Sequence, residues 1–183
     1  SIAPDRRVLG VIRPTAEAVG LHTQSNHIGL LGTEGTIQSG SYPMEISKLY
    51  PHITVVGQAC PMWVPLIENN EHNSHGADYF VKKYIDKLLQ NDPKIDTLVL
   101  ACTHYPLLLQ QIKKHVPEHM QIISQGTIIA QSLKDYLDRH PEMDSRLDKK
   151  GICTFFTTES VEKFKQSAST FLHESIEAHH LSW

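Results

Sequence analysis

The sequence predicts an α/β fold in which a mostly parallel sheet is flanked by helices. Short apolar runs alternate with longer stretches whose apolar residues recur at helical spacing. This alternation is typical of sheets in which a helix connects each strand to the next parallel strand. In addition, residues 96–100 form a short apolar run of the kind expected for a strand that helices cover on both faces.

The first half of the chain begins with two helix and strand pairs. A helix over residues 16–21 follows Pro14, and a strand is expected over residues 27–31. A helix over residues 42–50 and a strand over residues 53–56 come next. The sequence therefore already alternates in its first third.

The next helix has a clear apolar face. Its apolar residues recur at helical spacing between lysines and an aspartate: Phe80, Val81, Tyr84, Ile85, Leu88 and Leu89. It ends before Pro93, because a proline disfavours helical geometry at the preceding residue. In the second half we expect strands at 98–100, 122–123 and 152–156, helices at 128–137 and 161–172, and a polar loop at 140–150.

A cysteine lies where the strand of residues 98–100 ends. The sequence ACTHYP follows at residues 101–106 and contains Cys102. Pro106 opens an apolar stretch at 107–109, and proline is favoured at the first position of a helix. Cys102 is therefore expected at a strand-to-helix turn, the part of an open α/β sheet where ligands bind.

The residues at this turn suit acid–base chemistry. A thiol with a pKa near 8.5 is mostly protonated at neutral pH, and a nearby imidazole or helix N-terminus lowers that pKa. Taken singly, a cysteine at a strand end is usually a small buried residue and a histidine an ordinary polar one. Together at one turn, Cys102 and His104 indicate a catalytic site, with a Cys102 pKa below its ordinary value.

The sequence CTHYP at residues 102–106 resembles the second catalytic-cysteine motif of glutamate racemase. Further stretches resemble the same family in the same order: residues 10–14, 32–37, 39–42, 60–61, 64–68, 156–158 and 162–164. The resemblance therefore extends over nearly the whole chain and is more specific than any single motif.

The resemblance implies an architecture. Glutamate racemase has two α/β lobes that face each other across a cleft, and its chain crosses between them twice. By this resemblance residues 11–124 form the second lobe, with the catalytic cysteine, and residues 125–183 return to the first lobe. The family's Asp-Ser-Gly segment and its Ala-Cys-Asn-Thr stretch, which holds the first catalytic cysteine, do not occur here. The resemblance thus implies a C-terminal fragment that lacks the N-terminal third.

The resemblance also implies an activity, the cofactor-independent interconversion of L-glutamate and D-glutamate, which supplies D-glutamate for peptidoglycan. Inversion at Cα needs a base on one face of the carbon and an acid on the other, so two thiols flank it. Cys102 would hold one face, and His104 would assist its proton transfer. The chain carries one of these two thiols, so it is expected to be almost inactive alone.

Four further positions are implied to bind the substrate. Thr103 has a backbone N–H and a hydroxyl at the turn that suit a carboxylate. Thr33 and Thr36 match family positions that contact the substrate, and Glu68 matches an acid near the catalytic histidine. Without the resemblance, the two threonines would be expected to be ordinary turn and cap residues, and Glu68 a surface charge on a helix.

Three other positions carry no implied role in catalysis. Cys60 matches a position that is not a catalytic thiol, and Cys153 is expected to be a buried strand residue. At residues 124–126, where the family leads us to expect an aspartate, the chain has the sequence SQG. This departure lies outside the CTHYP motif.

Two alternatives remain beside glutamate racemisation. Aspartate racemase and related two-cysteine isomerases share the fold, but they commonly have Thr-Glu after the second cysteine. Here Thr103 is followed by His104, which favours glutamate. The other alternative is a folded but catalytically incomplete fragment.

Composition limits the expected partners. With 183 residues, 40% of them apolar, the chain can bury a sizeable core. A net charge of −3 gives no electrostatic reason for binding nucleic acid, and no apolar run has the length of a membrane span. We therefore expect glutamate as the small-molecule partner, no nucleic acid or membrane, and a homodimer as one way to cover apolar faces that a missing lobe would expose.

Cysteine and histidine usage argues against disulfides and metals. The three cysteines are far apart and odd in number, which fits a reducing compartment, here the cytoplasm. The twelve histidines are scattered, without Cys-x-x-Cys or His-Glu-x-x-His spacing, so no metal site is expected. His179 and His180 are expected in a solvated tail.

Overall fold

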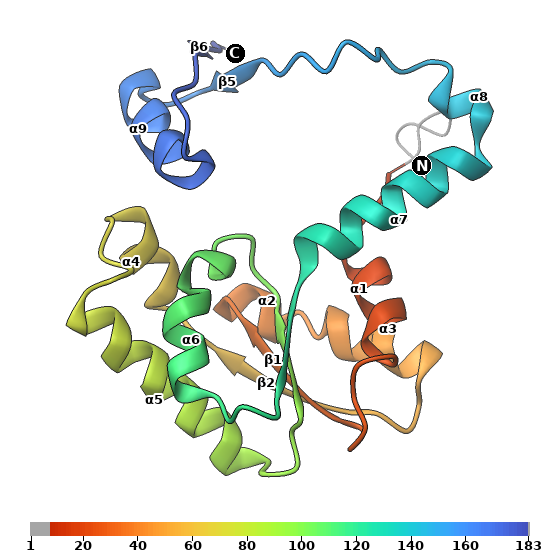
Figure 1. Cartoon of the computed structure of the whole chain (residues 1–183), viewed down its shortest axis with the longest axis vertical. Helices are drawn as coiled ribbons and strands as arrows, with labels where there is room; N and C mark the ends of the chain where they lie inside the picture. The colour runs from red at the N-terminus through yellow and green to blue at the C-terminus, as the bar shows by residue number, and fades with distance from the viewer. Residues whose placement is uncertain (1–7, 183) are drawn as a thin grey trace. The chain divides into compact units, whose positions relative to one another are not determined.

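The computed structural model describes residues 8–182. These residues form two compact units that divide between Tyr136 and Leu137. In Figure 1 the first unit is built around a sheet, and the second carries the last helix and two short strands. The division falls inside helix α7 (Gln125–Arg139). The lobe boundary expected after residue 124 stays a prediction.

The sheet of the first unit has four parallel strands: β1 (His27–Gly32), β2 (Thr54–Ala59), β3 (Thr97–Leu100) and β4 (Gln121–Ser124). Their order is β2-β1-β3-β4, so the chain adds strands first on one side of β1 and then on the other. Leu31 pairs with Leu100, and Leu100 pairs with Ser124, so three strands end at the same level. The direction of strand addition thus reverses between β1 and β3, and in open α/β sheets ligands bind beyond the carboxyl ends of the strands at such a reversal.

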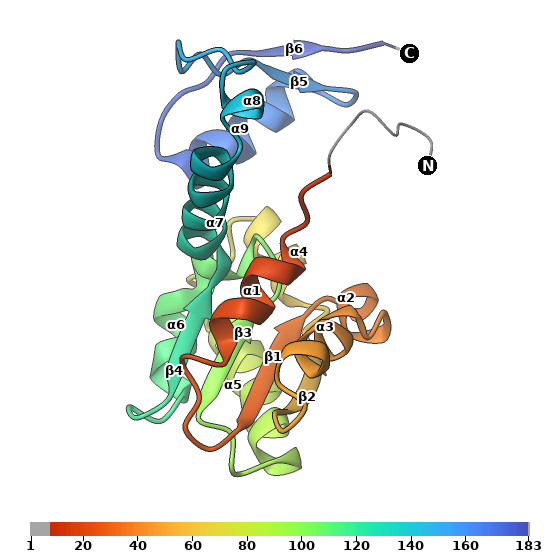
Figure 2. The ribbon, with the colours of Figure 1, turned by 90° about the vertical axis from the view of Figure 1, so that its right-hand side faces the viewer.

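Helices cover both faces of this sheet. On one face α1 (Ile12–Val19) packs with α3 (Ser41–Leu49), and on the other α5 (His75–Asn91) packs with α6 (Leu109–His115), as Figure 2 shows. Beneath α1 and α3 lies a buried apolar cluster that includes Ala16, Val19, Ile28, Leu30, Ile46 and Val99. The parallel sheet between two helical layers confirms the predicted fold class.

A glycine of β1, Gly29, lies where α5 packs on the sheet. A Cβ at Gly29 of β1 would lie 2.6 Å from Leu88 Cδ2 on α5 and 2.7 Å from Leu98 Cδ2 on β3. The missing side chain thus lets α5 approach the sheet closely. All four residues of β3 are buried, as the apolar run at residues 96–100 predicted.

A short helix begins soon after each of the first three strands. These helices are α2 (Glu34–Gln38), α4 (Trp63–Glu68) and the 3₁₀ helix η1 (Tyr105–Leu108). Helices α2 and α4 were not predicted from the sequence, because one or two helical turns carry too little periodicity. All three lie at the carboxyl edge of the sheet, where they position the candidate site.

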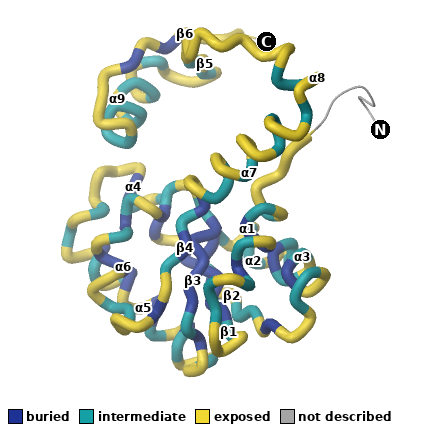
Figure 3. The backbone as a smooth tube through the Cα atoms, turned by 45° about the vertical axis from the view of Figure 1, so that its right-hand side comes forward, coloured by how far each residue is buried: buried dark blue, intermediate teal, exposed yellow. Residues whose placement is uncertain are grey.

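The second unit contains α8 (Pro141–Asp144), β5 (Phe155–Thr157), α9 (Val161–Leu172) and β6 (Ala178–His180), with β5 and β6 paired in parallel. Three expectations for this unit are wrong: the strand over 152–156 is shorter and later, the loop over 140–150 contains α8, and His179 and His180 lie in a strand. Strands of three residues depend on pairing with a neighbour, which local sequence does not reveal. Figure 3 shows that buried residues concentrate in the four-stranded sheet. Across residues 8–182, the helices lack the length and apolar character needed to span a bilayer.

Candidate active site

Three strand ends meet at the carboxyl edge of the sheet. Thr33 follows β1, Cys60 follows β2, and Cys102 lies two residues after β3. The Cys60 N–H donates to the Gly32 carbonyl over 2.9 Å, and the Ala101 N–H donates to the Leu31 carbonyl over 2.8 Å. These bonds extend strand pairing beyond the strand ends and place the three residues at the carboxyl edge of the sheet, where open α/β sheets bind ligands.

The turn that carries Cys102 is closed by backbone hydrogen bonds. The Tyr105 N–H donates to the Cys102 carbonyl over 3.2 Å, and the Leu107 N–H donates to the His104 carbonyl over 3.0 Å. The structure thus has the predicted strand-to-helix turn, although η1 begins at Tyr105 rather than at Pro106. Thr103 is exposed at the tip of this turn.

Burial controls the ionisation of Cys102. The half-buried thiol is desolvated, which raises its pKa above the ordinary value. The backbone N–H groups of His104 and Tyr105 lower the pKa but do not offset the burial. The predicted lowering of the Cys102 pKa is therefore wrong, because desolvation of the thiolate outweighs its hydrogen bonding. At neutral pH Cys102 is a protonated thiol.

The His104 ring is bonded to Glu68. Its Nε2 lies 2.5 Å from Oε1 of Glu68, which is the last residue of α4. The structure thus brings together two residues that are far apart in the sequence. His104 lowers the pKa of Cys102 through its backbone N–H, whereas the prediction assigned that effect to its imidazole.

Thr33 and Thr36 cap helix α2. The Thr33 Oγ1 accepts from the Thr36 N–H over 3.2 Å and lies 2.9 Å from the Thr36 Oγ1. This is the capping role that the residues alone predicted. Both side chains are half-buried at the end of β1, so their hydroxyls lie at the same edge of the sheet as Cys102.

The other two cysteines differ in their surroundings. Cys60 is fully buried, which raises its pKa and makes its thiol inert, as expected for a structural residue. Cys153 is exposed and precedes β5, so the prediction of a buried strand residue is wrong. The β-rich run that contains Cys153 pairs only from Phe155 onward.

A buried polar network beside the site was not predicted. Gln125 follows β4, and its Nε2 donates to the Thr15 Oγ1 over 2.9 Å and to the Tyr42 hydroxyl. Burial raises the pKa of Tyr42, the bond from Gln125 lowers it, and a charge on Cys102 adds to the rise. Gln125 lies in the sequence SQG at residues 124–126, where the family leads us to expect an aspartate. This departure was the sequence signal that could have pointed to the network. The network ties α1, α3 and the end of β4 together.

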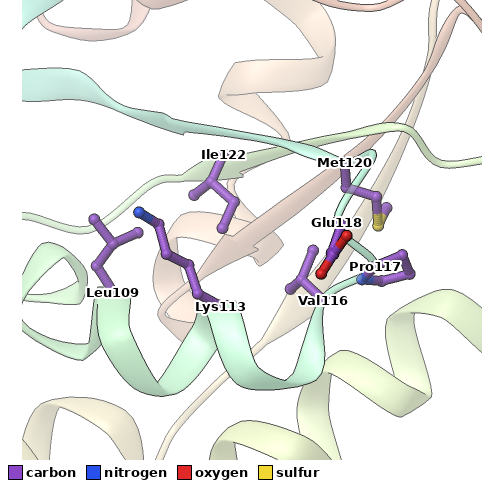
Figure 4. A pocket seen from close by; sticks show the side chains of 7 residues that line it. All are labelled: Leu109, Lys113, Val116, Pro117, Glu118, Met120 and Ile122. Carbon is purple, nitrogen blue, oxygen red and sulfur yellow. The ribbon is translucent and has the colours of Figure 1, made fainter.

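A separate cavity of about 370 Å³ lies between α6 and β4. It is lined by Leu109, Lys113, Val116, Pro117, Glu118, Met120 and Ile122 (Figure 4). None of the predicted site residues lines it. Within residues 8–182, no group of three or more histidine, cysteine or acidic side chains is arranged to hold a metal ion. The candidate site is the group of predicted residues at the carboxyl edge of the sheet, Cys102, Thr103, His104, Thr33, Thr36 and Glu68.

Comparison with known sequences identifies relatives. Residues 5–133 match the family model described as Asp/Glu/Hydantoin racemase. The chain is 39% identical to the glutamate racemase of Streptococcus uberis over 173 residues, which are 94% of this chain and 64% of that protein. It is 37% identical to the glutamate racemase of Oceanobacillus iheyensis, over 93% of this chain and 62% of that protein. The chain thus spans just under two thirds of these relatives.

Solved structures give the same result. A glutamate racemase isoform from Bacillus anthracis matches with a TM-score of 0.86 and 34% identity, over 99% of this chain and 66% of that one. The glutamate racemase of Francisella tularensis, solved in complex with D-glutamate, matches with a TM-score of 0.84 and 26% identity over the same shares.

Proposed function

The chain belongs to the Asp/Glu/hydantoin racemase family, and on that premise we propose that the protein containing it interconverts L-glutamate and D-glutamate without a cofactor. The observation that supports this most directly is the place of Cys102. It follows β3 beside the reversal of strand order between β1 and β3, at the same edge of the sheet as Thr33 and Thr36. The relatives at 39% and 37% identity are glutamate racemases.

In this proposal Cys102 transfers the proton on one face of the substrate Cα. Burial favours the protonated thiol, so Cys102 is in the state needed to deliver a proton to the carbanion for the enantiomer whose Cα–H faces away from it. A second thiol on the opposite face removes the original proton, and the roles exchange for the other enantiomer. His104, bonded to Glu68 over 2.5 Å, provides an acid–base pair at the same turn and assists the reverse step.

The remaining predicted residues bind the substrate in this proposal. The Thr103 N–H and hydroxyl are exposed at the turn and suit a carboxylate. The Thr33 and Thr36 hydroxyls suit the other carboxylate, because glutamate has one at each end. Glu68 holds His104 and offers its carboxylate toward the substrate ammonium.

The proposal also includes the use of the product and the assembly of the protein. The product D-glutamate supplies peptidoglycan synthesis in the cytoplasm. A homodimer is proposed as the assembly, since exposed apolar side chains such as Phe156 and Leu172 would be covered in it.

Exchange of the Cα proton with solvent deuterium tests the function. A protein that contains this chain and the second proposed thiol is incubated with L-glutamate, D-glutamate and aspartate in D₂O. Deuterium incorporation is followed by NMR. We expect exchange of both glutamate enantiomers, loss of racemisation in Cys102→Ser, and no effect of Cys153→Ser, since Cys153 is exposed in the second unit. Racemisation of aspartate in place of glutamate would overturn the proposal.

A further inference from the structure

Tyr105 connects the turn of Cys102, which follows β3, to the end of β2, which lies on the other side of β1. Its side chain is fully buried, and its hydroxyl donates to the Cys60 carbonyl over 3.2 Å. Its own N–H closes the turn by donating to the Cys102 carbonyl over 3.2 Å. One residue therefore bonds the Cys102 turn through its backbone and a second strand end through its side chain.

The anchor for this hydroxyl is rigid. The Cys60 N–H donates to the Gly32 carbonyl over 2.9 Å. The Cys60 carbonyl, besides the Tyr105 hydroxyl, also accepts from the Trp63 N–H over 3.2 Å. The Trp63 ring packs edge-on against the Tyr105 ring, with centroids 4.7 Å apart, and both residues are fully buried. The backbone of Cys60 is thus bonded to β1 and to α4 independently of its bond with Tyr105.

The turn itself needs such an anchor. The 3₁₀ helix η1 has four residues, and a single helical turn is not stable on its own. Without a tether, the short segment between β3 and α6 would open and close, and the position of Cys102 would vary.

We propose that Tyr105 is a positioning residue for Cys102, whose hydroxyl, bonded to the Cys60 carbonyl, holds the turn of residues 102–105 against the end of β2. The effect on catalysis rests on the proposed function, in which Cys102 transfers a proton. Such a transfer is sensitive to a displacement of the acid by about 1 Å. The fixed turn also keeps the His104 and Tyr105 N–H groups at the thiol, where they lower its pKa.

The variant Tyr105→Phe tests this assignment. The phenyl ring still fills its place against Trp63, so the thiol stays buried, whereas the hydroxyl tether is lost. We expect the pH midpoint of Cys102 alkylation to move upward, because the N–H groups lose their fixed orientation while desolvation persists. In a protein that contains this chain and the second proposed thiol, we expect kcat to fall by about tenfold and KM to change by less than about twofold.

Three ionisable groups that interact with Cys102 are Tyr42, Cys60 and Tyr105, and burial raises the pKa of each. Their side chains are therefore neutral in the pH range in which the Cys102 thiol begins to ionise. His104 and Glu68, bonded to each other at the same turn, are present both in Tyr105→Phe and in the unsubstituted protein, so the comparison between the two isolates the Tyr105 hydroxyl.

Tyr84→Phe is the matched control. The Tyr84 ring also packs near Trp63, at a centroid distance of 6.3 Å, but Tyr84 lies on α5. Its variant should leave the alkylation midpoint unchanged. An unchanged midpoint in Tyr105→Phe, or an equal shift in both variants, would overturn the assignment.

A measurement on the unsubstituted chain covers the case in which Tyr105→Phe does not fold. The Tyr105 and Leu107 amides, which close the turn, should exchange with solvent as slowly as those of β3. Rapid exchange would show that the turn is not held and would overturn the proposal. Absence of racemisation in an unsubstituted protein that contains both proposed thiols would instead reject the proposed function, and the alkylation profile would still decide the role of Tyr105.

Discussion

At the scale of the residue, Cys102 shows how two opposing effects set the state of a thiol. Burial disfavours the thiolate, and the N–H groups of the turn favour it. Because burial is the larger effect, the resting thiol keeps its proton. In the proposed pair of thiols that exchange acid and base roles, a protonated Cys102 is in the state that the acid requires.

The order of cysteine alkylation tests this balance. We expect Cys153 to react fastest because it is exposed, Cys102 several times more slowly, and Cys60 slowest because it is fully buried. A raised pKa means that less thiolate is present at neutral pH, so the midpoint for Cys102 should lie above the ordinary value of about 8.5. Mass spectrometry of each cysteine peptide after timed labelling gives the rates.

His104→Ala provides the contrast for this measurement. Alanine retains the backbone N–H that acts on the thiol, so the Cys102 midpoint should move little. A midpoint below 8.5 that rises in His104→Ala would instead support the pairing expected from sequence, in which the imidazole stabilises the thiolate.

Sequence reasoning found the residues of this turn but not their interactions. The strand before Cys102 and the proline after it are local signals, so the turn was predictable. The bonds from His104 to Glu68 and from Tyr105 to Cys60 join residues 36 and 45 positions apart. Such bonds depend on the strand order, which local patterns do not determine. Burial of the thiol also depends on that packing, and for this reason the direction of its pKa shift was missed.

At the scale of the element, Asp96 fixes the loop that enters β1 to the start of β3. Its Oδ2 accepts from the backbone N–H groups of Gln24 and Ser25, and its Oδ1 accepts from the hydroxyls of Thr23 and Thr97. Burial acts to raise the pKa of Asp96, but these four donors together hold it well below the usual range. The loop therefore depends on an ionised carboxylate.

Asp96→Asn should lower the free energy of unfolding by about 2 kcal/mol at neutral pH, because an amide can accept at one oxygen only. The folded-state pKa is depressed, so the stabilisation is complete above the unfolded pKa of about 3.9 and is lost as the pH falls below it. The difference between the two proteins in urea unfolding should thus shrink at low pH. Asp86→Asn, which breaks an exposed ion pair with Lys82, should cost less than about 1 kcal/mol at any pH.

The predictability of each helix followed its length, whereas the strands of the four-stranded sheet were predicted from their apolar runs. Helix α5 runs over 17 residues and was expected from its apolar face, and β3 was expected from its apolar run. Helices α2 and α4 and strand β6 have six residues or fewer and were missed. In these short elements, capping and strand pairing replace periodicity as the source of stability.

At the scale of the whole molecule, the two units differ in how much they bury. The first has a four-stranded sheet between helices, whereas the second has two strands of three residues, and no residue of α9 is buried. A two-stranded sheet is at best marginally stable in water. The proposed chemistry depends on the first unit, which contains Cys102, His104 and Glu68.

The last prediction concerns the activity of the 183-residue chain by itself. The Ala-Cys-Asn-Thr stretch that holds the other thiol in the family does not occur in this sequence. The chain would therefore supply an acid–base group on only one face of the substrate Cα. We expect little or no racemisation of glutamate, and exchange of the Cα proton in D₂O far below ordinary enzyme turnover of about 10 s⁻¹. Cys60→Ser provides the control, since a buried thiol with a raised pKa cannot serve as the second base. Turnover at an ordinary rate that disappears in Cys60→Ser would show that Cys60 is that base. It would also contradict the assignment of Cys60 to the structure of the strand ends.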